Sequence, residues 1–234
     1  MITSNDCWLK TSCKKYLTKE NCECKDNDVF CMKLFKLNYL YEQSLLSNEQ
    51  RNRLTLVLDA SEIDKKAFVY LSKIEKTIEN FINDGKNLYI YSETTGNGKS
   101  SWAIRLMQEY FNSIWYKTDL SCKGLFISVP KFLLAMKYNI NTPDVYYNHI
   151  KDNVFNADLV IWDDICTKMA TSFEHEHLLS ILDNRIINNK SNIFTSNIQP
   201  DKLVDFMGDR LYSRIINWSQ CIQFKGTDKR TLFK

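Results

Sequence analysis

The chain of 234 residues is long enough for one full domain, or for one domain with a small appendage. With 44% hydrophobic and 25% charged residues it has enough apolar mass for a packed core, which excludes a disordered chain. No stretch approaches the roughly 18 consecutive apolar residues of a membrane helix, and no basic segment followed by an apolar run marks a secretion signal. We therefore expect a cytoplasmic protein without a membrane partner. The net charge of +3 neither requires nor excludes nucleic acid.

Five of the eight cysteines fall within the first 31 residues, and the other three are scattered. In a reducing compartment, clustered thiols are more often metal ligands than disulfides. The spacing C-x5-C-x8-C-x-C-x6-C is not that of a paired C-x2-C knuckle, so packing of the thiols as small apolar groups stays open as an alternative. The cluster consists of Cys7, Cys13, Cys22, Cys24 and Cys31.

Three segments follow one another along the chain. Residues 1–46 show little hydrophobic periodicity until 29–46, where apolar residues recur at the spacing of a helix. So short a unit buries little core, and a structural metal would supply stability that packing does not. We predict a small Cys-rich module over 1–46, a polar linker over 47–60 and a larger domain over 61–234.

The larger domain opens with a long amphipathic helix that begins at 60–62 and ends at Gly85. After it, apolar runs of strand length alternate with helical stretches, and the runs are apolar on both faces. This pattern is typical of a parallel sheet covered by helices on both sides, an α/β fold. The predicted strands are 88–91, 125–129, 159–162, 192–195 and 221–224. The predicted helices between them are 100–114, 131–138, 174–187 and 202–215.

The first predicted strand runs into the segment 92–100, Ser-Glu-Thr-Thr-Gly-Asn-Gly-Lys-Ser, and then into a helix. A strand, a glycine-rich loop and a helix in this order form the context that a phosphate-binding loop requires. Gly96 and Gly98 let backbone N–H groups approach phosphate oxygens closely, and the start of the helix attracts the same anion. The segment therefore predicts a nucleotide site. A glycine-rich turn with a surface lysine is the structural alternative.

Further residues of this loop are predicted to contact the nucleotide or its Mg²⁺ ion. Lys99 would contact the β- and γ-phosphates of ATP, and the hydroxyl of Ser100 would bind Mg²⁺. The predicted nucleotide contacts are completed by Thr95, Asn97 and Ser101. The usual pattern G-x-x-x-x-G-K-[ST] has a glycine where this chain has Glu93.

Two neighbouring strands end in polar residues. The strand 159–162 is followed by Asp163 and Asp164. In P-loop ATPases the first such carboxylate holds Mg²⁺ and the next polarises the attacking water, so we assign Asp163 to the metal and Asp164 to the base role. Asp164 is one methylene shorter than the glutamate common there. Asn197, at the end of the next strand, can hydrogen-bond both the γ-phosphate and the water. A helix cap and a simple turn are the alternatives.

The segment 208–215, Gly-Asp-Arg-Leu-Tyr-Ser-Arg-Ile, contains two arginines, Arg210 and Arg214. Arginine suits the stabilisation of phosphoryl charge because its planar guanidinium is always charged. Supplied across a subunit boundary, such a residue acts as an arginine finger. Solvated side chains on a helix surface are the alternative.

The four elements in this order resemble the AAA+ ATPases, and within them the bacterial and phage helicase loaders of the DnaC/DnaI type. The tripeptide Thr-Ser-Asn at 195–197 is also similar to the related transposition helper ATPases of the IstB type. The resemblance covers about residues 60–225. It implies a P-loop fold with a reduced or absent lid, Asn197 as sensor 1, Arg214 as arginine finger and Arg210 as a second phosphate-facing residue. The layout with a Cys-rich start looks like loaders encoded by phages of low-GC Gram-positive bacteria.

In that family the small N-terminal module commonly binds zinc and docks on the replicative helicase. The resemblance implies four zinc ligands, for which we choose Cys7, Cys13, Cys22 and Cys31, with Cys24 as the alternative to Cys22. The implied cofactors are ATP, Mg²⁺ and Zn²⁺. The implied partners are the hexameric replicative helicase of the host, single-stranded DNA and further copies of the chain, joined through their ATP sites. A slow ATPase activity, stimulated by DNA or the partner, is expected.

Two other functions were weighed. A nucleotide-gated adaptor or transposition helper with little turnover is favoured by Asp164 in place of glutamate. A nucleotide or nucleoside kinase would need an acceptor pocket and a basic lid, and the sequence indicates neither.

Two further segments attract attention. The aromatic and basic stretch 126–147 could bind single-stranded DNA, or could be an amphipathic helix with a solvated lysine face. Its candidate contacts are Lys131, Lys137, Tyr138, Tyr146 and Tyr147. Glu174-His175-Glu176-His177 resembles a metal site, but its histidines point to different helix faces, so we expect a solvated helix start.

Overall fold

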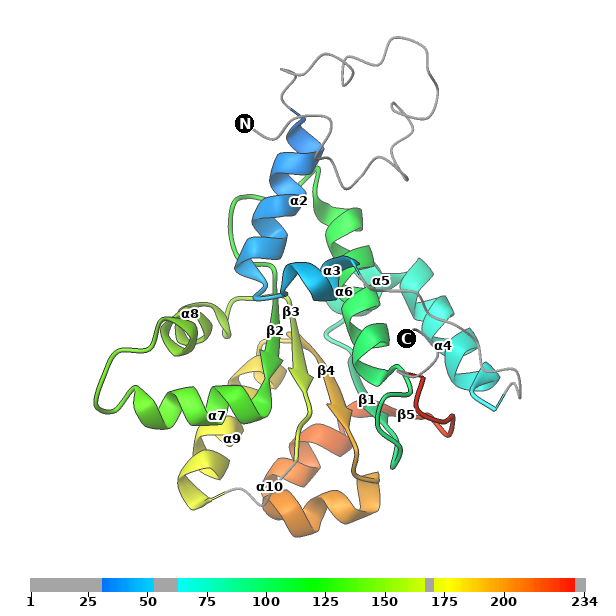
Figure 1. Cartoon of the computed structure of the whole chain (residues 1–234), viewed down its shortest axis with the longest axis vertical. Coiled ribbons are helices and arrows are strands. Elements are labelled where there is room, and N and C mark those ends of the chain that lie inside the picture. Colours follow the sequence, from blue (N-terminus) through cyan, green and yellow to red (C-terminus); the bar gives the residue numbers. More distant parts are fainter. Residues whose placement is uncertain (1–30, 53–62, 167–170, 230–234) are drawn as a thin grey trace.

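In the computed structural model, residues 31–52, 63–166 and 171–229 are described (Figure 1). Cys7, Cys13, Cys22 and Cys24 lie outside these residues. The described chain contains one five-stranded sheet with the order β2-β3-β4-β1-β5, and every neighbouring pair is parallel. The predicted α/β fold with a parallel sheet is thus confirmed. The strands are β1 (Asn87–Tyr91), β2 (Gly124–Ser128), β3 (Leu159–Asp163), β4 (Ser191–Ser196) and β5 (Ser219–Gln223).

Successive residues of each strand face opposite sides of the sheet, and both sides are buried in β1, β2, β3 and β4, whereas β5 at the sheet edge is mostly exposed. In β3, Leu159 and Ile161 belong to one hydrophobic cluster, whereas Val160 and Trp162 belong to the other. The strands therefore contain uninterrupted apolar runs, which is why the sequence predicts them within two residues of their observed bounds.

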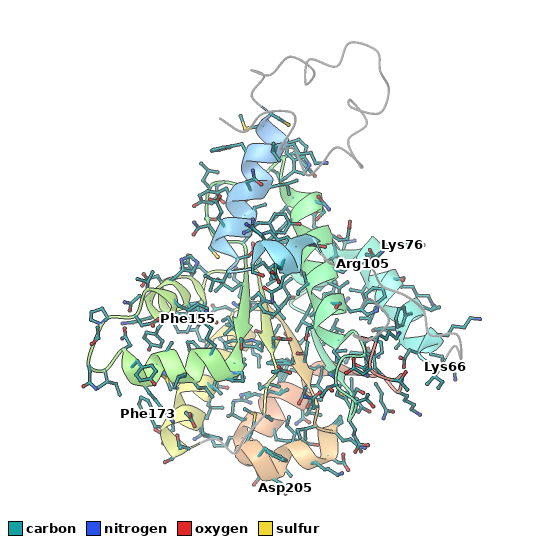
Figure 2. The ribbon with its side chains drawn as sticks, in the orientation of Figure 1. Lys66, Lys76, Arg105, Phe155, Phe173 and Asp205 are labelled. Carbon is teal, nitrogen blue, oxygen red and sulfur yellow. The ribbon has the colours of Figure 1, made fainter. Side chains whose placement is uncertain are left out.

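One face of the sheet is covered by helices from the first half of the chain. They are α2 (Met32–Gln43), α3 (Asn48–Asn52), α4 (Lys65–Lys76), α5 (Ile78–Asn83) and α6 (Lys99–Ile114). Residues of α2, α4, α5 and α6 share a single hydrophobic cluster with the sheet. Lys66 and Lys76, labelled in Figure 2, are on the exposed side of α4. α3 lies within the predicted linker 47–60.

The predicted long helix that ends at Gly85 is wrong in its continuity, because it divides at Thr77 into α4 and α5. Thr77 has φ −126° and ψ 27°, outside the helical region. Its N–H donates to the carbonyl oxygen of Ile74 and its hydroxyl donates to that of Lys73. These local bonds of a β-branched residue close the first helix before the second begins.

The described part of the predicted 1–46 module packs directly on the larger domain. Leu37 and Leu40 of α2 are fully buried in the cluster that also contains Phe111 of α6. The rings of Tyr41 and Phe111 meet edge to face at 5.4 Å. The carbonyl oxygen of Ser44 accepts the N–H of Phe126 in β2. A separate module over 1–46 stays a prediction, and α2 is tied to the sheet.

The other face of the sheet is covered by helices from the second half of the chain. They are α7 (Val129–Tyr138), α8 (Val145–Asn153), α9 (Ser172–Ile187), the short 3-10 helix η3 (Pro200–Lys202) and α10 (Leu203–Ile216). The sequence reading missed α8. Only Tyr147 and Ile150 of this helix are buried, while Val145 is exposed, so its apolar residues form no regular stripe. No helix among the described residues is long and apolar enough to cross a membrane.

The start of α9 differs from the solvated helix start that the sequence suggested. Thr171 and Glu174 form a capping box, in which each side chain accepts the other's backbone N–H. Glu174 is fully buried and also pairs with Lys137 at 3.0 Å. The ring of His177 stacks on that of Phe132 with centroids 5.9 Å apart. Phe173 is exposed beside them (Figure 2).

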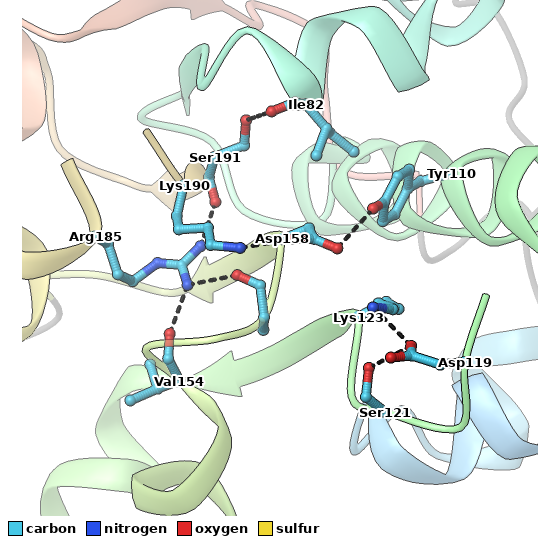
Figure 3. A network of polar contacts seen from close by, with 11 residues as sticks. Ile82, Tyr110, Asp119, Ser121, Lys123, Val154, Asp158, Arg185, Lys190 and Ser191 are labelled. Carbon is cyan, nitrogen blue, oxygen red and sulfur yellow. Dashed lines mark hydrogen bonds and ion pairs between the residues drawn. The ribbon is translucent and has the colours of Figure 1, made fainter. Parts of the chain in front are cut away.

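A fully buried arginine joins three segments at the amino-terminal edge of the sheet (Figure 3). Arg185 of α9 donates to the carbonyl oxygens of Val154, Ala157 and Ser191 at 2.5, 2.8 and 2.6 Å. Its Nε donates to Oδ1 of Asn192 at 2.7 Å. Burial lowers the pKa of Arg185 to about 9. All four contacts lie beside the first residues of β3 and β4, so this side chain fixes where both strands begin.

We expect Arg185→Met to lower the free energy of unfolding by about 3–5 kcal/mol, because three backbone carbonyls lose their buried donor. Urea denaturation measures this loss. Lys86→Met, which removes an exposed ion pair with Asp84, serves as the control and should cost less than about 1 kcal/mol. Equal stability of the two variants would contradict the structural role of Arg185.

Candidate functional site

The glycine-rich loop lies between the carboxyl end of β1 and the start of α6. Gly96 and Gly98 have φ of 72° and 103°, in the left-handed region that favours glycine. A Cβ added at Gly98 would meet no atom of the described residues within 4 Å. Gly98 immediately precedes α6 as its N-cap residue. No side chain caps this helix, and the first turn of the helix has no acidic residue. The loop is thus open, and electrostatically favourable to an anion, where the helix starts.

The loop is held by its own polar side chains. Oγ of Ser92 accepts the N–H of Thr94 at 3.1 Å and Nδ2 of Asn97 at 2.6 Å. Lys99 is only 5% exposed, and its Nζ donates to the carbonyl oxygen of Thr94 at 2.9 Å and to Oδ1 of Asn97 at 3.3 Å. The ammonium group is therefore inside the loop rather than on the surface. Thr95 is exposed, and Ser100 and Ser101 are half-buried.

At Glu93 the loop departs from the usual pattern, which has a glycine at this position. Glu93 is exposed and does not have a positive φ, so its backbone has no need of glycine. Its Oε1 accepts Nε2 of Gln199 at 2.9 Å and is 3.7 Å from Nζ of Lys202. The glutamate connects the loop to the segment that follows β4.

Asp163 meets the loop at the end of β3. Its carboxylate accepts the hydroxyl of Thr195 at 2.7 Å, and the nearby hydroxyl of Ser100 acts to lower its pKa. Burial raises the pKa of Asp163, and the nearby charge of Asp164 acts in the same direction. The two hydroxyls and Lys99 oppose this shift, because they favour the ionised carboxylate. Ser100 and Asp163, the two residues assigned to Mg²⁺, thus lie near each other.

Thr195 is the residue that the sequence reading passed over. It is fully buried, donates to Asp163 and accepts the N–H of Asp164 at 3.1 Å. Its carbonyl oxygen also accepts the N–H of Ile165 at 3.0 Å. Asp164 has φ 56°, so the chain turns sharply here. A polar residue inside an otherwise apolar strand was the available signal.

Asn197 follows β4. Its Oδ1 is buried without a hydrogen-bond partner among the described residues. Such an atom costs free energy unless a further group satisfies it. Because an amide can present either its oxygen or its NH₂ group, this side chain suits a water molecule or a phosphate oxygen. The residues present at this edge of the sheet therefore fit a nucleotide with Mg²⁺.

The two arginines of α10 are in different situations. Both follow Gly208, whose φ of 69° and ψ of 166° kink the helix. Nε of Arg214 forms an ion pair with Asp183 of α9 in the same chain. Arg210 is exposed and has no hydrogen bond or ion pair with other described residues.

Most side chains suggested for DNA contact are engaged within the fold. Tyr147 is buried, and burial raises the pKa of Tyr146 to about 12. Nζ of Lys131 is 4.1 Å from the ring centre of Tyr146, and Lys137 pairs with buried Glu174. Tyr138 is 63% exposed at the end of α7.

Of the predicted zinc ligands, Cys31 is the one that lies within the described residues. Cys31 precedes α2 and is half-buried. No group of three or more metal-binding side chains occurs within 31–52, 63–166 and 171–229. Cys122 and Cys166 are buried and Cys221 is exposed.

A scan against protein-family models and a search of curated proteins gave no match. Solved structures do match. The crystal structure of the DnaC helicase loader is 16% identical, aligns with 76% of this chain and all of that chain, and has a TM-score of 0.61. The crystal structure of DnaI is 18% identical over 80% of this chain and 95% of that chain, also with a TM-score of 0.61. The chain has the fold of these two structures.

A third structure with this loader-type fold is the replication initiator DnaA bound to AMPPCP and single-stranded DNA. It is 19% identical, with a TM-score of 0.56 over 78% of this chain and 52% of that chain. The described residues after β5 form no helix.

We expect Thr195→Val to lower the free energy of unfolding by about 1–3 kcal/mol, because the buried carboxylate of Asp163 and the N–H of Asp164 each lose a partner. Thr195→Ser keeps the hydroxyl and is the matched control, with a smaller loss. Urea denaturation at neutral pH compares the two. A valine variant as stable as the serine variant would show that this hydroxyl is dispensable.

Proposed function

We propose that the protein is an ATP-dependent loader of a replicative DNA helicase. The observation that supports this most directly is the proximity of Ser100 to Asp163, two residues 63 positions apart whose oxygens suit Mg²⁺. They meet at the carboxyl edge of a sheet whose fold is that of DnaC and DnaI. The proposal combines a nucleotide site, from the residues, with a loader role, from the fold.

Each side chain of the site has a proposed part in ATP hydrolysis. The loop amides and Lys99 bind the phosphates, and Ser100 and Asp163 hold Mg²⁺, which neutralises phosphate charge when bound. Asp164 polarises the attacking water as its base. Asn197, as sensor 1, orients that water through its buried amide.

Self-association through the ATP sites would supply the arginine finger from a neighbouring copy. Arg214 is bound to Asp183 of its own chain, so its use in a neighbour's site requires that ion pair to open. Arg210 is already exposed and could reach outward without such a change. ATP would then favour assembly of copies along single-stranded DNA, and hydrolysis would release them.

The partners proposed are the hexameric helicase of the host and single-stranded DNA. Support for DNA comes from the structural neighbour DnaA, which is bound to single-stranded DNA. On this chain the available contacts are few, with Tyr138 the most exposed aromatic of the 126–147 stretch. The helicase contact is assigned to the Cys-rich module with its zinc ion.

A nucleotide-gated adaptor or transposition helper ATPase is the second candidate. It is favoured by Asp164, whose shorter side chain extends less far toward an attacking water than glutamate would. Steady-state ATP turnover with and without single-stranded DNA separates the two, because only the loader mechanism requires hydrolysis for release.

Lys99→Ala is expected to weaken Mg²⁺–ATP binding about a hundredfold, because a buried, charged donor to the phosphates is lost. Calorimetric titration with ATP measures this change. Lys86→Ala removes an exposed lysine elsewhere on the domain and should leave binding unchanged. Loading of the helicase that co-purifies with the chain should fail for Lys99→Ala, and unimpaired loading would exclude an ATP switch.

The purified full chain is expected to contain one zinc ion, held by thiolates of the N-terminal cluster. Elemental analysis measures the metal content. Cys13→Ser should release the metal, whereas Cys221→Ser, which changes an exposed cysteine in β5, should keep it. Absence of zinc from the unmodified protein would reject the site.

A further inference from the structure

The segment that follows β5 passes over the nucleotide loop. We call residues 225–229 the C-terminal strap. The N–H of Lys229 donates to the carbonyl oxygen of Gly96 at 3.0 Å. Nδ2 of Asn97 lies 3.4 Å from the carbonyl oxygen of Gly226. The strap therefore touches the loop at two consecutive residues, Gly96 and Asn97.

The fit between strap and loop leaves no space for a side chain at Gly96. A Cβ added there would be 2.0 Å from Oδ1 of Asp228. At this distance a side chain at residue 96 would require the Asp228 side chain to move. The left-handed φ of Gly96 adds a second requirement for glycine at the same position.

One buried carboxylate fixes the strap at its other end. Asp64, which immediately precedes α4, is 2% exposed. Its Oδ1 accepts the N–H of Lys225 at 2.7 Å and its Oδ2 accepts that of Gly226 at 3.1 Å. The carboxylate does not cap α4. These two hydrogen bonds tie the carboxylate to the strap, more than 160 positions away in the sequence.

Asn97 extends this connection to the phosphate-binding lysine. While its Nδ2 faces Gly226 and Ser92, its Oδ1 accepts Nζ of Lys99. The amide of Asn97 is almost fully buried, so its orientation is fixed by these partners. A chain of contacts then runs from Asp64 through Gly226 and Asn97 to Lys99.

We propose that Asp64 is a positioning residue for nucleotide binding: it holds the C-terminal strap on the loop and thereby sets the place of the Lys99 ammonium. Asp64 need not touch the nucleotide. The proposal rests on the proposed function only in that the loop binds ATP.

The test measures ATP affinity in the presence of Mg²⁺ by calorimetric titration of the full chain. Asp64→Ala should weaken binding about tenfold, because both N–H groups of the strap lose their acceptor. Asp64→Asn keeps one acceptor oxygen and should fall between this variant and the unmodified chain. Asp84→Ala, at an exposed aspartate after α5, is the control and should bind ATP normally.

A double-mutant cycle separates positioning from a purely structural effect. If Asp64 acts through Asn97, Asp64→Ala should change ATP affinity several-fold less in an Asn97→Ala background than in the unmodified chain. A structural role alone would lower the thermal unfolding temperature of Asp64→Ala yet leave the two changes in affinity independent. Independence in the cycle, or unchanged or tighter binding by Asp64→Asn, would overturn the proposal.

The proposed function can fail separately. If the unmodified chain and Lys99→Ala both fail to bind ATP, the loop is not a nucleotide site. If the unmodified chain binds ATP and the Asp64 variants bind it as tightly as the control Asp84→Ala does, the strap has no positioning role.

Discussion

The position of β4 between β1 and β3 is the constraint on which the site depends. All pairs in this sheet are parallel, so the carboxyl ends of the three strands meet at one edge. The glycine-rich loop follows β1, Asp163 ends β3, and Thr195 comes near the end of β4. If β4 were not beside β3, Asp163 would be separated from the hydroxyl of Thr195. The neighbour relations of the strands, more than any single motif, therefore bring the chemistry together.

The two edges of the sheet differ in how fully their buried polar groups are hydrogen-bonded. At the amino-terminal edge, Arg185 finds acceptors for its donors within the fold, and this side chain is structural. At the carboxyl edge, burial raises the pKa of Asp163, and its hydroxyl partners lower this pKa only in part. The buried Oδ1 of Asn197 has no hydrogen-bond partner among the described residues. Incomplete satisfaction of buried polar groups is costly in a core and expected at a binding site. The contrast itself indicates which edge binds a ligand.

Sequence patterns predicted those features that depend on neighbouring residues. Apolar runs on both faces predicted the strands, and the loop from 92 to 100 was evident from its glycines between strand and helix. The features that were missed depend on contacts between distant segments. Thr195 acts through its hydrogen bond to Asp163 at the end of β3. Arg214 of α10 pairs with Asp183 of α9. α8 has only two buried residues, too few to give a recognisable helical pattern. No local spacing encodes such pairings.

The two loop glycines illustrate how local and distant requirements combine. Both have a left-handed φ, yet only Gly96 has a distant segment, the strap, packed against it, whereas the space at Gly98 is open. The loop is thus closed on the side of the strap and open at the uncapped start of α6. An anion approaching from the open side meets the helix dipole first and then the buried ammonium of Lys99. Support from the strap on one side and an uncapped helix start on the other suit a preorganised phosphate site, because binding then costs little reorganisation.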